Sequence, residues 1–95
     1  MYVILLTYVK PLEEVDRLLP EHAAYLQKGY DEGKLICSGR KEPRTGGVIW
    51  ARFESDDEVR QFIENDPFFR HGAATYEPIR FIPTKYIPSL GDLKS

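Results

Sequence analysis

The sequence opens on an apolar run over residues 2–9 whose two sides are equally apolar. Its β-branched and aromatic residues indicate a strand, in which successive side chains point to opposite faces of a sheet. One face would carry Tyr2, Ile4, Leu6 and Tyr8, and the other Val3, Leu5 and Val9. A later run repeats the pattern, with Val48 and Trp50 opposite Ile49, Ala51 and Phe53. We therefore expect a sheet that has to be covered on both faces.

Helical periodicity follows the first strand but is interrupted by a proline. Pro11 suits the start of a helix, whereas Pro20 falls inside the periodic stretch, where proline removes a backbone hydrogen bond. We therefore predict a short helical turn over residues 12–18 and a main helix from Pro20 to Gly33, because glycine suits the C-terminal cap. The buried face would carry Leu12, Val15, Leu19, His22, Leu26 and Gly29.

Three more strands and a second helix are predicted farther along the chain. The strands cover residues 35–40, 48–53 and 76–82. Ser55 and Glu58 match a capping box that opens the helix, and Pro67 requires the helix to end by Asn65. Pro78 lies within the last strand, which indicates an edge position or a bulge.

The predicted order of elements, β-α-β-β-α-β, is typical of an α+β ferredoxin-like sandwich. This fold has a four-stranded antiparallel sheet with both helices on one face. The chain has 95 residues, room for one domain, which we place at residues 1–86, with a tail over residues 87–95. Because the helices cover only one face of an apolar sheet, we expect a homodimer that covers the other.

Composition and motifs exclude several classes of protein. With 13 Lys and Arg against 15 Asp and Glu, the net charge is −2, so we expect no nucleic-acid partner. The opening run has no basic leader and is too short to cross a bilayer, and one cysteine, expected to be a small buried residue, suits a reducing cytoplasm. No Walker loop, G-x-G-x-x-G, C-x-x-C or H-E-x-x-H is found, so we expect neither a cofactor nor a metal.

His22 and Asp66 are the residues with the strongest chemical potential. His22 lies on the apolar face of the predicted main helix, where a core histidine bonded to a backbone carbonyl is the alternative. Asp66 follows the second helix, where a turn aspartate is the alternative. Because that turn can lie beside the first helix in this fold, the carboxylate can hold the imidazole and form a general base.

Weaker candidates complete the predicted site. Ser38 can hydrogen bond to a substrate oxygen, His71 can assist proton transfer, and Arg40 can anchor an anionic group. Each also has an ordinary structural role as a strand, loop or surface residue. Aromatic side chains that can line a flat pocket, or simply fill the core, are Tyr8, Tyr25, Tyr30, Trp50 and Phe68.

The chain resembles the YciI-like (YCII-related) family over residues 2–86. The resemblance is carried by Pro20-Glu21-His22, by Asp31-Glu32-Gly33-Lys34-Leu35 leading to Ser38-Gly39, and by Asn65-Asp66-Pro67-Phe68 followed by Gly72. It implies a ferredoxin-like unit that dimerises into an α/β barrel, similar to muconolactone isomerase. It also implies an active-site pair at His22 and Asp66.

One characterised member of this family is a dehydrochlorinase that acts on a chlorinated hydroxyhydroquinone. The resemblance therefore implies a cofactor-independent enzyme that acts on a small cyclic or phenolic molecule by proton transfer with elimination, or by isomerisation. His22 would be the base, Asp66 its orienting partner, and Ser38 a hydroxyl donor. The alternative is a non-catalytic module that binds a small molecule or another subunit.

Overall fold

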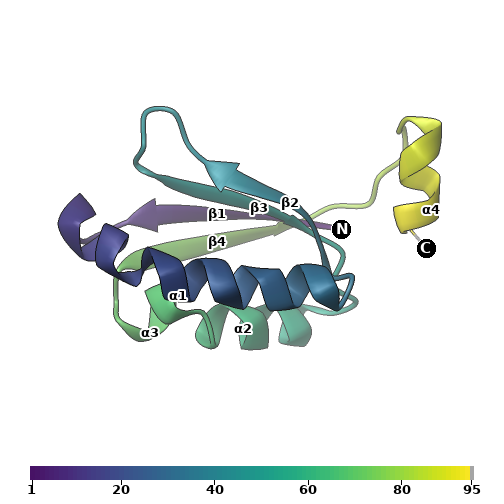
Figure 1. The fold of residues 1–95 in the computed structure, drawn as a ribbon. Coiled ribbons are helices and arrows are strands. Elements are labelled where there is room, and N and C mark those ends of the chain that lie inside the picture. The colour runs from purple at the N-terminus through teal and green to yellow at the C-terminus, as the bar shows by residue number, and fades with distance from the viewer. Residues whose placement is uncertain (95) are drawn as a thin grey trace.

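A computed structural model of the chain describes residues 1–94 and shows one sheet with helices on one side (Figure 1). The four strands lie in the order β2-β3-β1-β4 and pair antiparallel throughout. The strands are β1 (Tyr2–Tyr8), β2 (Leu35–Arg40), β3 (Gly46–Ala51) and β4 (Ala74–Arg80). The helices that cover one face are α1 (Leu12–Asp31), α2 (Asp56–Glu64) and α3 (Pro67–Arg70). The predicted ferredoxin-like α+β class is confirmed.

The core lies between the sheet and these helices. The even-numbered side of β1 faces the helices, because Tyr2, Ile4 and Leu6 are buried together with Ile49 and Ala51 of β3. Alternation along the strands therefore places Val3 and Leu5 of β1, and Val48 and Trp50 of β3, on the open face.

A single helix, α1, replaces the predicted break at Pro20. The helix runs through Pro20, and its buried side chains lie on both sides of this proline: Val15, Leu18, His22, Leu26 and Gly29. Burial of this continuous face outweighs one missing backbone hydrogen bond, since packing supplies most helical stability in proteins. The predicted face was also slightly wrong, because Leu18 is buried whereas Leu12 and Leu19 are exposed.

Strands β3 and β4 each begin and end two residues earlier than predicted. Gly46 lies before the strand predicted over residues 48–53, yet it pairs with Thr7 at the start of β3. A Cβ atom at Gly46 would lie 1.8 Å from the carbonyl oxygen of Leu6, so only glycine allows β1 and β3 to approach here. Gly46 is therefore a requirement of the strand pairing.

The connection from α2 to β4 contains an element that the sequence analysis missed. Ser55 caps α2 as predicted, with its hydroxyl accepting from the Glu58 amide at 3.2 Å, and the helix ends at Glu64. The chain then turns at Asp66 into the four-residue helix α3. A helix this short has no periodicity to detect, and its start is signalled only by Asp66 and Pro67.

The open face of the sheet carries a row of side chains across all four strands. Val3 is paired with Trp50 on one side and Ile79 on the other, and Trp50 is paired with Cys37. Cys37 is exposed on this face rather than buried as expected. Pro78 lies in β4, which is an edge strand as its proline predicted.

After β4 the chain leaves the body of the fold (Figure 1). The tail contains a 3-10 helix, Pro88–Leu90, and α4 (Gly91–Lys94), while Ser95 lies outside the described residues. Two isoleucines along this segment, Ile82 and Ile87, are strongly exposed. Within residues 1–94, none of the helices has the length and apolar character needed to cross a membrane.

Candidate active site

His22 is held in the middle of α1 with only 8% of its surface exposed. It shares the buried face of the helix with Leu18 and Leu26, each one helical turn away. A buried imidazole requires a hydrogen-bond partner, since leaving a polar group unpaired in the interior costs free energy. The position of His22 on α1 therefore directs its side chain into the interior, and a hydrogen-bond partner is needed to fix the orientation of the imidazole ring.

Asp66 is that partner, and it is completely buried. Its Oδ1 atom lies 2.8 Å from His22 Nδ1 and also accepts from the Phe68 backbone N–H at 3.0 Å. The second contact caps α3, whose first residue is Pro67, and thereby fixes the carboxylate. The predicted approach of His22 and Asp66 is confirmed.

Phe68 supports the imidazole from one face. The two rings lie 4.0 Å apart between centroids and nearly parallel, at 9°. Tyr8 meets the same phenyl ring edge-on at 5.9 Å and 86°. Phe68 is itself almost completely buried, so this stack restricts rotation of His22 about its side-chain bonds.

The arrangement assigns different tasks to the two ring nitrogens of His22. With Nδ1–H donating to Asp66, the neutral imidazole carries its lone pair on Nε2. When Nε2 takes up a proton, the adjacent carboxylate stabilises the resulting imidazolium. The pair can therefore act as a general base.

Negative charge at Asp66 also affects two neighbouring tyrosines. Burial, followed by the charge of Asp66, raises the pKa of Tyr25 to about 12, and the same two causes raise the pKa of Tyr76. The Tyr25 hydroxyl donates to the Phe62 carbonyl at 2.7 Å. Both tyrosines stay neutral around this carboxylate at ordinary pH.

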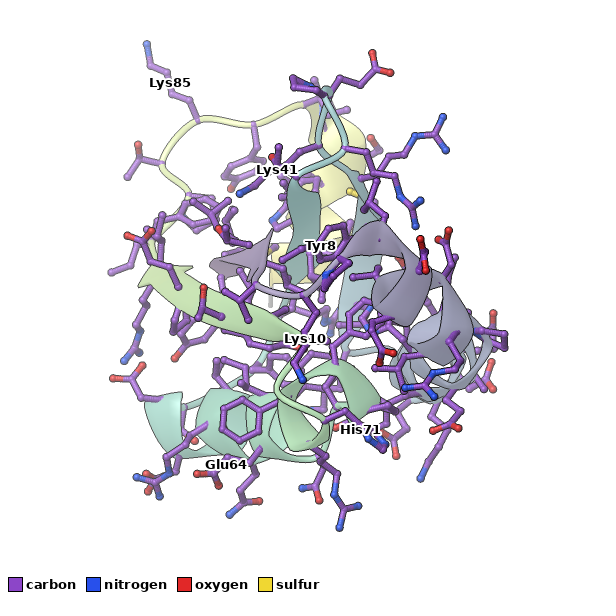
Figure 2. The ribbon with its side chains drawn as sticks, turned by 90° about the vertical axis from the view of Figure 1, so that its left-hand side faces the viewer. Tyr8, Lys10, Lys41, Glu64, His71 and Lys85 are labelled. Carbon is purple, nitrogen blue, oxygen red and sulfur yellow. The ribbon has the colours of Figure 1, made fainter. Side chains whose placement is uncertain are left out.

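His22 lines a cavity of about 200 Å³ between α1 and the sheet. The cavity adjoins a wider hollow of about 440 Å³, and the two share Tyr8, Leu19 and Arg40. Tyr8 lies near the centre of this end of the molecule (Figure 2). The inner cavity is lined by Leu6, Tyr8, Leu19, His22, Ala23, Leu26, Ser38, Gly39, Arg40, Gly47, Val48, Ile49 and Phe68.

Several predicted site residues meet at this cavity. Tyr8, Arg40 and Phe68 line it together with His22 and Ser38, whereas Asp66 lies behind the imidazole. The Ser38 hydroxyl forms a hydrogen bond of 2.7 Å with the Tyr30 hydroxyl, and either oxygen can be the donor. Ser38 therefore comes to the site already paired with a second hydroxyl group.

Three predicted site residues are not brought to this cavity. Trp50 lies on the opposite face of the sheet, because its register pairs it with Val3. Tyr25 points toward α2, where it bonds to Phe62. His71 ends α3 and is exposed, on the α3 side of the molecule (Figure 2). Strand parity and a missed helix explain why sequence alone misplaced Trp50 and His71.

Two charged residues at the wider hollow were missed. Arg44, from the loop between β2 and β3, forms an ion pair of 2.5 Å with Asp16 of α1. Its guanidinium also lies 6.0 Å from the centre of the Tyr8 ring. The contact joins residues that are 28 positions apart, and no local motif in the sequence signals it. Arg44 thereby holds the loop between β2 and β3 against α1, beside the wider hollow.

Within residues 1–94, His, Cys, Asp and Glu side chains form no group of three or more that could hold a metal ion.

The sequence and the fold of the chain are both similar to those of known proteins. The sequence model of the YCII-related domain matches residues 1–82. Among solved structures, the chain is similar to 5-chloro-2-hydroxyhydroquinone dehydrochlorinase (TftG) from Burkholderia phenoliruptrix AC1100, in complex with 2,5-dihydroxybenzoquinone. The identity is 26% and the TM-score 0.72, over 85% of this chain and 93% of the other. No curated protein sequence matches the chain.

Proposed function

Because the chain belongs to the YCII-related domain family, we propose that it is an enzyme that acts on a small cyclic or phenolic molecule without a cofactor. The observation that carries the proposal is the 2.8 Å contact between His22 Nδ1 and Asp66 Oδ1, at the wall of a cavity. A histidine oriented by a buried carboxylate, with its other nitrogen free, is the arrangement of a general base.

His22 is the catalytic base, and Asp66 is its positioning residue. In the proposed tautomer, Nδ1–H donates to Asp66 across the 2.8 Å contact and Nε2 carries the lone pair. A substrate hydroxyl or an acidic C–H bond that reaches Nε2 loses its proton, and the new imidazolium lies against the negative carboxylate. Stacking on Phe68 preserves the ring orientation during the transfer.

The reaction class is an elimination or an isomerisation. The solved relative carries the name of a dehydrochlorinase and was captured with a dihydroxybenzoquinone, which supports elimination from a ring. In that case His22 takes the proton, its bonding electrons form a C=C or C=O bond, and the leaving group departs with the electrons of its own bond. In an isomerisation the same proton returns to a different atom of the ring.

Ser38 is proposed to hold an oxygen of the substrate. Its hydroxyl reaches the cavity from β2, opposite the α1 side that carries His22. The bond to Tyr30 can orient the Ser38 proton toward a ligand, because the tyrosine hydroxyl can act as its donor. Negative charge that develops on a ring oxygen after proton loss would be stabilised there.

A homodimer through the open sheet face is part of the same proposal. The row of Val3, Trp50 and Ile79 leaves an apolar surface that the chain's own helices do not cover. The buried Trp50 Nε1 has no hydrogen-bond partner within residues 1–94. A second copy packed on this face would remove the apolar row from water.

A substrate screen tests the proposal. Chlorinated and unchlorinated phenols, hydroxyquinols and small lactones are incubated with the wild-type protein and with His22→Gln, which retains polarity but cannot accept a proton. His71→Gln is the matched control, because His71 lies outside the cavity. The proposal expects turnover that is lost in His22→Gln and unchanged in His71→Gln. Equal turnover in the wild type and His22→Gln would refute the role of His22 as the base, and binding of these compounds without any turnover would favour a binding module.

A further inference from the structure

The outer part of the cavity is positively charged. Arg40 lines both the inner cavity and the wider hollow, so this residue lies where the two meet. Arg40 is the last residue of β2. Its side chain lies on the same side of the strand as that of Ser38, because residues two apart share a face. The residues that line the outer hollow are Tyr8, Asp16, Leu19, Arg40 and Arg44.

Strand register makes room beside Arg40. Arg40 is paired with Gly47, and Gly47 with Leu6, so the position between the arginine and the leucine carries no side chain. A Cβ atom at Gly47 would lie 3.0 Å from the Gly39 carbonyl oxygen, which is tight against backbone. Because Gly47 has no side chain, the cavity is open beside Arg40, and a ligand atom can reach the arginine.

Arg40 is also the cation of this region whose charge is not neutralised. Arg44 is paired with Asp16 at 2.5 Å. Among residues 1–94, no carboxylate forms an ion pair with Arg40. The other charge of the site, on Asp66, lies at its inner end behind His22. The cavity thus has His22, hydrogen-bonded to Asp66, at its inner end, and Arg40 at its outer end.

The size of the inner cavity limits what fits between these ends. An apolar cavity of about 150 Å³ is sufficient to bind benzene. At about 200 Å³, the inner cavity accommodates one six-membered ring with small substituents, with further atoms extending into the hollow. Aliphatic and aromatic walls from Leu26, Ile49 and Phe68 suit the faces of such a ring.

We infer that the site selects single-ring phenolic molecules with an anionic substituent, such as a carboxylate, and that Arg40 recognises this substituent. The placement of the hydroxyl at His22 rests on the proposed function. Guanidinium groups bind carboxylates through two parallel hydrogen bonds, which fixes the orientation of the ring as well as its charge. A negative substituent at Arg40 is also kept away from the Asp66 carboxylate.

Three catechols that differ in one group test this selection. The 3,4-dihydroxybenzoate ion, 4-methylcatechol and 4-(aminomethyl)catechol carry negative, neutral and positive substituents on one ring. Their affinities are measured by calorimetry for the wild-type full chain, for Arg40→Gln, and for the matched control Arg60→Gln on α2. Arg60 is exposed, is paired with Asp57 and lies outside the cavity.

The inference expects the anion to bind about tenfold more tightly than the neutral catechol, and the cation most weakly. Arg40→Gln should remove this advantage without changing the affinity of 4-methylcatechol, whereas Arg60→Gln should bind all three as the wild type does. High salt should reduce the advantage of the anion. Equal affinities for the anion and the neutral compound, an equal loss of both in Arg40→Gln, or no binding of any compound at millimolar concentration would overturn the inference.

The same titrations with His22→Gln separate this inference from the proposed function. A charge preference that persists in His22→Gln, in a protein that turns over no phenol, would support recognition by Arg40 and refute catalysis. Turnover that depends on His22, with no preference for anionic over neutral phenols in the wild type or in Arg40→Gln, would support catalysis and refute the role of Arg40.

Discussion

Forty-four positions separate His22 from Asp66 in the sequence, and 2.8 Å separate His22 Nδ1 from Asp66 Oδ1 in the fold. The distance is closed by packing of α3 against α1, which places the turn after α2 beside the middle of α1. The same Oδ1 atom accepts from the Phe68 backbone N–H, so the short helix that carries Asp66 also fixes it. Base and orienting group are therefore held together by the packing of α3 against α1.

Replacing Asp66 by Asn should preserve the fold and reduce activity. Asparagine caps helices about as well as aspartate, so α3 should remain. The imidazole, however, loses the charge that stabilises its protonated form, and its tautomer is no longer fixed. We expect kcat/KM to fall by about 10²- to 10⁴-fold on any substrate found in the screen, with an unchanged circular dichroism spectrum. Asp57→Asn, on the exposed side of α2, is the control that should retain full activity.

Stability should fall between pH 10 and pH 12 in a way that depends on Tyr25. Burial and the charges of Asp66 and Glu32 raise the pKa of Tyr25 from 10.0 to about 12 in the folded state. The folded protein then holds this proton more tightly than the unfolded chain, so the contribution is complete below pH 10 and is lost as the pH rises to 12. Tyr25→Phe should be less stable at pH 8, because the bond to Phe62 is missing.

Urea unfolding at half-unit pH steps gives the measurement. The stability difference between the wild type and Tyr25→Phe should shrink as the pH rises from 10 to 12. A constant difference over this range would show that the hydroxyl does not titrate as described.

Gly46→Ala should destabilise the sheet where β1 and β3 approach. The added Cβ atom would lie 1.8 Å from the Leu6 carbonyl oxygen, and its three nearest atoms are all backbone atoms of Leu6 and Thr7, so no side chain can move aside. We expect a loss of about 2 kcal/mol or more in the free energy of unfolding. Gly39→Ala is the matched control, since its Cβ atom would meet nothing within 4 Å, and it should remain close to the wild type. Equal stabilities for the two variants would contradict the pairing described here.

Ile79→Glu should separate the proposed dimer without unfolding the subunit. Ile79 is 42% exposed on the open sheet face, opposite Val3, so a charge there is tolerated in the monomer and not in a dimer interface. Sedimentation at micromolar concentration should show a dimer for the wild type and a monomer for the variant. Leu12→Glu, at a comparable exposure on α1, should remain a dimer. A monomeric wild type would refute the proposed assembly.

Periodicity and breakers were sufficient to predict the fold, because each strand and long helix has its own local pattern. They failed where a long-range contact decides the local structure. Pro20 interrupts the pattern, yet α1 continues because both of its halves pack on one core. Glycine is typical of turns, yet Gly46 is the first residue of β3, where it lies close to the Leu6 backbone.

The candidate site was predictable for a different reason. His22 stands out as a polar residue on an apolar helical face, and Asp66 lies in a short run that resembles a family. Neither pattern indicates which further side chains reach the cavity. Alternation along the strand separates Trp50 from Ile49 but does not indicate which face of the sheet packs against the helices. The ion pair between Arg44 and Asp16 joins distant residues, and no local sequence pattern near either residue indicates it.

The tautomer of His22 can be measured without a substrate, and it decides whether Nε2 is available to accept a proton. Long-range nitrogen–proton correlation spectra of the free protein should show a protonated Nδ1 and an unprotonated Nε2 for His22, with Asp66→Asn disturbing this pattern and Asp57→Asn leaving it unchanged. His71 provides the internal reference, as an exposed histidine at the end of α3. A protonated Nε2 on neutral His22 would contradict the account, since the nitrogen offered to the substrate would then be unable to accept a proton.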